Sequence, residues 1–154
     1  MIQGRLHELD LGVIPAPSGA GAVVLHSEEG LDCLLVMVVH DPAAKGCKVA
    51  LVTLQGCIQS IFGYPNDEAY GAIPGASYGF YEVTETDWPD RIREFNALRF
   101  PDTSRDDRSR HFFIGCHDAS GQFLARDLRV EVFEDDFYVV LERALRRLVP
   151  RSPE

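Results

Sequence analysis

The residues best suited to chemistry are neighbours, His117 and Asp118. An imidazole and a carboxylate together can bind a metal ion or act as general acid and base. His111 lies six residues earlier, but along one strand that spacing separates the two imidazoles by ~20 Å, too far to share one ion. The predicted site therefore keeps His117 and Asp118. The structural alternative is that Asp118 caps a turn and His117 is a hydrogen-bonded histidine at the rim of the sheet.

A second polar group occurs in residues 63–77, a segment dense in Gly, Pro and Tyr. Its polar residues are Asn66, Asp67 and Glu68. The segment has no apolar period, and loops of this length inside a compact domain are often functional. If the segment reaches His117, its carboxylates would form a small acidic cleft there, surrounded by tyrosines. Those tyrosines are Tyr64, Tyr70 and Tyr78. The structural alternative is that Asn66 caps a short helix whose first turn favours the two acids.

Two motif matches fail on their context. Residues 75–79 fit the G-x-S-x-G pattern of a hydrolase nucleophile elbow, which needs a strand before the serine and a helix after it. Here a loop precedes Ser77 and a strand-like run follows. Residues 19–21, Gly-Ala-Gly, match the start of a dinucleotide-binding loop, but residue 24 is valine and a strand-like run follows. The sequence therefore predicts no cofactor and no catalytic residue.

The four cysteines show no metal-ligand spacing. They are Cys33, Cys47, Cys57 and Cys116, with no C-x-x-C pair and no zinc-knuckle pattern among them. If the strands that contain Cys33 and Cys47 pair through a turn at residues 41–46, Cys47 lies opposite His40 and Cys33 lies opposite Leu54. That register holds these two cysteines beyond disulfide reach. We expect reduced thiols and no metal centre.

Composition and charge restrict the class of protein. The chain has 154 residues, 45% of them hydrophobic, and a formal net charge of −9 at pH 7. This length predicts one domain, residues 1–154, around a single core. An acidic chain lacks the clustered Lys and Arg on which phosphate binding depends, so we expect no nucleic acid partner. The longest apolar run, residues 33–39, is far shorter than the ~20 residues that cross a bilayer. Charged residues interrupt the first ten, so we expect a cytoplasmic protein without a membrane span.

Strand-like runs dominate the first half of the sequence. Turn residues rather than helices separate them, which predicts an antiparallel meander. Residues 33–39 predict a central strand buried on both faces, and residues 57–62 predict a further strand after a break at Gly56. Residues 111 to about 128 predict a β-hairpin, with residues 122–132 as its returning strand and turn residues at 118–121.

Two stretches have a helical apolar period. In the first, Asp87 can cap a helix whose apolar stripe is expected to face the core. That stripe consists of Trp88, Ile92, Phe95 and Leu98. In the second, acidic residues at 134–136 precede a helix whose last turn is rich in Arg. We therefore expect an α+β fold, a mainly antiparallel sheet of about six to eight strands with two amphipathic helices (about 88–99 and 135–148) packed on one face.

Two segments of the sequence resemble segments of a known group of proteins. Residues 62–69 contain the letters P-N-D-E-A, and residues 111–125 form an aromatic strand that ends in His117-Asp118. Over about the central 60 to 65 residues, the chain resembles a family of uncharacterised small bacterial proteins with these two features. In that family a phenylalanine and then an acidic residue follow the H-D pair; Phe123 matches, whereas Leu124 stands in the position of the acid. The resemblance implies a bacterial cytoplasmic protein and a shared fold, and it implies no activity.

Taken together, these patterns favour a non-enzymatic domain that binds a protein or small ligand through residues 64–78 and the hairpin end. The candidate ligand-binding residues are Tyr64, Asn66, Asp67, Glu68, His117 and Asp118. The alternative is a metal-dependent or acid–base enzyme that uses His117, Asp118, Asp67 and Glu68. A third hypothesis, which rests on net charge alone, is an immunity-type protein that neutralises a basic partner. A homodimer through an edge strand or an Arg-rich helix stays open.

Overall fold

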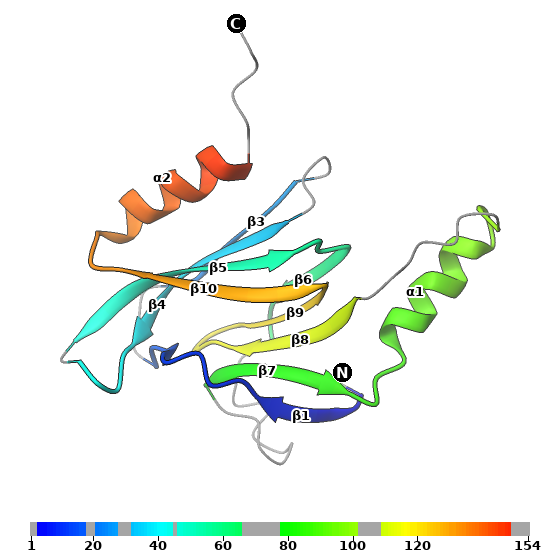
Figure 1. Cartoon of the computed structure of the whole chain (residues 1–154), viewed down its shortest axis with the longest axis horizontal. Helices are drawn as coiled ribbons and strands as arrows, with labels where there is room; N and C mark the ends of the chain where they lie inside the picture. The colour runs from blue at the N-terminus through cyan, green and yellow to red at the C-terminus, as the bar shows by residue number, and fades with distance from the viewer. Residues whose placement is uncertain are drawn as a thin grey trace, which may run out of the picture.

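The computed structural model describes residues 3–17, 21–27, 32–44, 46–65, 78–101 and 109–148. Over these residues the chain forms ten strands and two helices, with the strands in two antiparallel sheets (Figure 1). The hairpin sheet contains, in order, β1 (Arg5–Glu8), β7 (Gly79–Thr84), β8 (Arg110–Gly115), β9 (Ser120–Ala125) and β6 (Gln59–Gly63). The helix sheet contains β10 (Asp127–Phe133), β5 (Cys47–Gln55) and β4 (Cys33–His40), and the far edge of β4 pairs with β2 (Ile14–Pro15) and β3 (Val23–His26).

The main core lies between the two sheets. On β4, Leu35 and Met37 point into this core, whereas Leu34 and Val36 point to the opposite face and pack under a helix. Side chains alternate along a strand, so a strand covered on both faces must be apolar at nearly every position. This explains the unbroken apolar run at residues 33–39 and confirms the prediction of a central buried strand.

Helix α2 (Phe137–Leu148) covers part of the outer face of the helix sheet. Its buried residues Val140 and Ala144 are spaced by four, so they lie on one side of the helix against Leu34 and Val36 of β4. The second predicted helix is thus confirmed, with bounds two residues shorter at its N-terminal end.

Helix α1 (Trp88–Ala97) differs from its prediction. Phe95 is 76% exposed and Leu98 is 82% exposed, and the helix contains no buried residue. Figure 1 shows α1 projecting away from the hairpin sheet at the ends of β7 and β8, which it connects. An apolar period shows that a helix has one apolar side, but it does not show that this side packs against the sheets. The expectation that both helices pack on one face therefore holds for α2 alone.

The chain passes between the sheets at Gly56 and at Arg126. Gly56 has φ of +58°, in the left-handed region that glycine adopts without steric cost, so the bend favours a glycine. After this bend the strand at residues 59–63 pairs with β9 rather than with β5. At Arg126 the predicted strand at 122–132 divides into β9 and β10, which pair in different sheets. The expected single meander is thereby corrected to two sheets.

The fold class predicted from the sequence is confirmed: α+β, with mainly antiparallel sheet. The hairpin is confirmed as β8 and β9, which pair antiparallel from Arg110 opposite Ala125 to Gly115 opposite Ser120. Within the described ranges, neither helix is long and apolar enough to cross a membrane.

Candidate functional site

The turn between β8 and β9 presents the two residues that the sequence singles out. The Cys116 backbone N–H donates to the Ala119 carbonyl oxygen at 3.0 Å, which closes the turn with His117 and Asp118 at its tip. Nε2 of His117 lies 3.7 Å from a carboxylate oxygen of Asp118, and the His117 side chain is about half exposed. The Asp118 side chain is 89% exposed, so both polar groups are accessible to a ligand.

Residues on both sides of segment 66–77 contact this turn. The Tyr78 hydroxyl lies 3.2 Å from Nδ1 of His117, and their ring centroids are 6.1 Å apart. From the other side of the segment, the Pro65 carbonyl oxygen accepts a hydrogen bond from the Ser120 hydroxyl at 3.1 Å. The residue before Pro65, Tyr64, is 90% exposed. The remaining predicted residues, Asn66, Asp67 and Glu68, and Tyr70 with them, lie outside the described residues.

A cavity of about 120 Å³ opens between the two sheets beside the turn. Met37 of β4 and Phe62 of β6 line its apolar part, and His117 and Asp118 line its polar part. An apolar core cavity of about 150 Å³ is large enough to hold benzene, so this one has room for a small apolar group. We call the cavity together with Tyr78, His117 and Asp118 the hairpin-end site.

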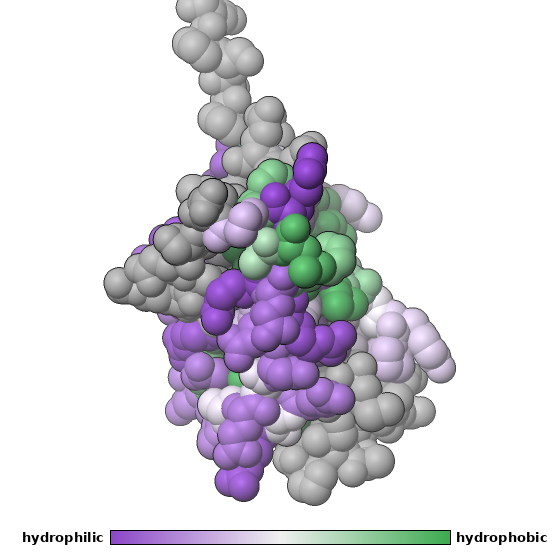
Figure 2. Space-filling view, turned by 90° about the vertical axis from the view of Figure 1, so that its right-hand side faces the viewer, coloured by the Kyte–Doolittle hydropathy of each residue, from purple (hydrophilic) through white to green (hydrophobic). Residues whose placement is uncertain are grey.

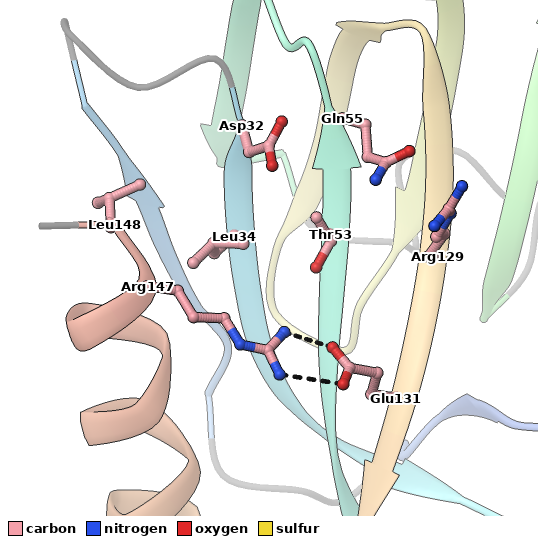
Figure 3. A pocket seen from close by; sticks show the side chains of 8 residues that line it. All are labelled: Asp32, Leu34, Thr53, Gln55, Arg129, Glu131, Arg147 and Leu148. Carbon is pink, nitrogen blue, oxygen red and sulfur yellow. Dashed lines mark hydrogen bonds and ion pairs between the residues drawn. The ribbon is translucent and has the colours of Figure 1, made fainter. Parts of the chain in front are cut away.

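A larger and more open pocket of about 650 Å³ lies on the outer face of the helix sheet (Figure 3). Arg147, at the end of α2, donates two hydrogen bonds to the Glu131 carboxylate of β10. This pairing lowers the pKa of Glu131 and raises that of Arg147. Arg129 pairs with Asp127 at 3.3 Å. Since these charged groups already satisfy one another, the pocket is a weaker candidate than the hairpin-end site.

Sequence reasoning missed a group that we call the Cys–His cluster: His26, Cys33 and Cys57. Their ligand atoms, one imidazole nitrogen and two sulfurs, all lie within 4.8 Å of one another. The predicted register of Cys33 opposite Leu54 is confirmed, and Cys57 follows three residues later, beyond the bend at Gly56. That spacing, together with His26 opposite Cys33 in the β3–β4 pair, is the signal that could have revealed the cluster.

The two thiols of the cluster interact with each other. A hydrogen bond that the Cys33 thiol donates to Cys57, together with burial, raises the pKa of Cys33. The same contact lowers the pKa of Cys57, because a hydrogen bond donated by Cys33 favours the Cys57 thiolate. Cys57 is therefore the thiol that loses its proton more readily.

His111 has a structural role. Its side chain is buried, with Nδ1 3.1 Å from Oγ1 of Thr86 and Nε2 3.2 Å from Oε1 of Gln122. The Trp88 ring packs edge-on against it, with centroids 4.8 Å apart. Burial lowers the pKa of His111 to about 4, so the imidazole is neutral at pH 7. Because the ring is buried as well as hydrogen-bonded at both nitrogens, a ligand from solvent does not reach His111.

The apolar side of α1 forms a further exposed surface. Seen from the side on which α1 projects, the molecule shows a hydrophobic patch beside a hydrophilic surface (Figure 2). The exposed apolar residues on α1 and just after it are Phe95, Leu98 and Phe100.

Comparisons with known protein families, with curated proteins and with solved structures found no match for this chain.

Proposed function

We propose that the protein is a binding domain whose ligand surface is the hairpin-end site. One observation carries this proposal. The cavity between the sheets opens beside the same turn that holds His117 and Asp118, where Tyr78 contacts His117 and Pro65 contacts Ser120. Binding sites of this kind combine an apolar recess with a few polar groups at its rim.

The size and lining of the site indicate the kind of ligand. A recess of about 120 Å³ accepts one apolar group, such as a single ring or the side chain of a leucine on a partner protein. His117 then offers a hydrogen bond to a polar atom next to that group. The ligand is therefore a small molecule or a protruding side chain with an apolar body and a polar end.

Small ring compounds test this proposal. Toluene and phenol have similar size, but only phenol carries a hydroxyl group. In titrations of ¹⁵N-labelled protein, we expect both to shift the amide signals of Met37, Cys116 and Ala119, with affinities in the range of about 1 mM, which corresponds to about −4 kcal/mol. His117→Ala should weaken phenol about 5- to 10-fold by removing one hydrogen bond and should leave toluene unchanged.

A cavity-filling variant provides the control. Ala22 lines the cavity, so Ala22→Leu should abolish binding of both compounds. Ala43→Leu makes the same change at an exposed residue elsewhere and should bind as the wild type does. If Ala22→Leu binds both compounds normally, the ligand surface lies somewhere other than the hairpin-end site.

A second candidate function, self-association through α1, is favoured by the exposure of Phe95 and Leu98. Two copies of α1 packed side by side would bury both apolar sides in one symmetric interface.

Sedimentation velocity over a range of concentrations tests the association. We expect the wild type to shift from monomer to dimer as its concentration rises, and Phe95→Ser with Leu98→Ser to stay monomeric. Arg93→Ser, on the opposite side of the helix, serves as the control and should still dimerise. A wild type that is monomeric at every concentration would contradict this role of α1.

A further inference from the structure

The Cys–His cluster lies where an edge of one sheet approaches an edge of the other. His26 ends β3 of the helix sheet, and its Nδ1 lies 2.7 Å from Oγ of Ser60 on β6 of the hairpin sheet. Cys33 and Cys57 are buried, whereas His26 is exposed. An ion could therefore reach the cluster from solvent and meet two sheltered sulfurs. Among the described residues, these are the three side chains whose metal-ligand atoms come within mutual reach.

The orientation of His26 suits a metal ligand. Its Nε2 lies 3.2 Å from the backbone carbonyl oxygen of Cys57. Because a carbonyl can only accept, Nε2 carries the proton, and Nδ1 of the neutral ring keeps its lone pair. This lone pair faces the Ser60 hydroxyl, which donates a hydrogen bond to it. Histidines that bind metals usually donate their other N–H to a carbonyl or carboxylate, which holds the ring in place.

We propose that His26, Cys33 and Cys57 form a binding site for Zn²⁺. Two thiolates and one imidazole form a donor set that binds thiophilic ions such as Zn²⁺ in preference to hard cations such as Mg²⁺. In a tetrahedral site with Zn–S bonds of about 2.3 Å, two sulfurs lie about 3.8 Å apart. The atoms of the cluster are already within 4.8 Å, so a shift of about 1 Å or less completes the geometry.

Three protein ligands leave one tetrahedral position open. Ser60 or a water molecule would fill it, since Oγ of Ser60 already lies 2.7 Å from Nδ1 of His26. The fold supplies this arrangement without a sequence motif, because the three ligands come from β3, β4 and the bend after Gly56. The site is independent of the hairpin-end site, and either proposal can fail without the other.

Cobalt provides the spectroscopic test. We expect reduced wild-type protein to bind one Co²⁺ per chain, with a thiolate-to-cobalt charge-transfer band and the visible bands of tetrahedral Co²⁺. Added Zn²⁺ should displace the Co²⁺ and remove these bands. His26→Gln and Cys57→Ser should each weaken Co²⁺ binding at least 10-fold. His26 is exposed, so its variant tests the site even if Cys57→Ser does not fold.

Cys47→Ser is the matched control, because Cys47 is exposed and lies outside the cluster. It should bind Co²⁺ as the wild type does. Three results would overturn the proposal: no charge-transfer band in the wild type, bands that persist in both cluster variants, or bands lost in Cys47→Ser. Isolation of the protein with a Cys33–Cys57 disulfide that survives reductant would also overturn it, since the sulfurs would then be unavailable to a metal.

Discussion

Phe123→Ala is expected to lower the free energy of unfolding by about 3–5 kcal/mol, the usual cost of deleting a fully buried phenylalanine. Phe123 is completely buried in the core between the sheets. Its ring lies over Gly121, where a Cβ would come within 2.4 Å of Cε2 of Phe123. Deleting the ring would leave a void next to a glycine, which has no side chain to fill it. Urea denaturation should show the loss as a lower transition midpoint with little change in slope.

The same substitution on α1 is the matched control. Phe95 is 76% exposed, so Phe95→Ala should change the free energy of unfolding by no more than about 0.5 kcal/mol. The comparison is made at a protein concentration low enough to keep the chain monomeric. Equal losses at the two positions would mean that α1 packs into the core after all, as its apolar period predicts.

A fall in stability between pH 6.5 and pH 4 is expected from His111. Burial lowers its pKa to about 4 in the folded protein, whereas an unfolded histidine has a pKa of about 6.5. Between these values the unfolded chain binds a proton that the folded protein does not, so stability decreases as pH falls through this window. The difference of about 2.5 pKa units corresponds to about 3 kcal/mol. Below pH 4 the loss from this residue is complete.

Replacing the titrating group isolates this contribution. His111→Gln keeps hydrogen-bonding atoms near Thr86 and Gln122 but has no ionisable group. We expect the wild type to lose about 3 kcal/mol more than this variant between pH 7.5 and pH 4 in urea denaturation at a series of pH values. Carboxylates such as Glu82, whose pKa is lowered by its hydrogen bond to Arg110, remain in both proteins and cancel. An unchanged pH dependence in the variant would show that His111 titrates near its ordinary pKa in the folded protein.

The candidate site was predictable in part. His117 and Asp118 follow from a turn signal after an aromatic strand, and the structure places both at the tip of the β8–β9 turn. The cavity beside them could not be predicted, because Met37 and Phe62 reach it from strands of two different sheets. The Cys–His cluster could not be predicted for the same reason, because His26 hydrogen-bonds the carbonyl of a residue 31 positions away. No local spacing rule covers such a separation.

By itself, the sequence determined the features that depend on near neighbours along the chain. These include the β8–β9 hairpin with its His117-Asp118 turn, the central strand β4, the apolar side of α2 and the α+β class. Strand and helix periods and turn residues act over a few residues, so a linear pattern is sufficient to read them. Only the tertiary structure decided which sheet each strand joins, that α1 contains no buried residue, and that His26 meets Cys33 and Cys57. These outcomes depend on how segments far apart in the chain pack together. The same local pattern of strands and helices is compatible with more than one such arrangement.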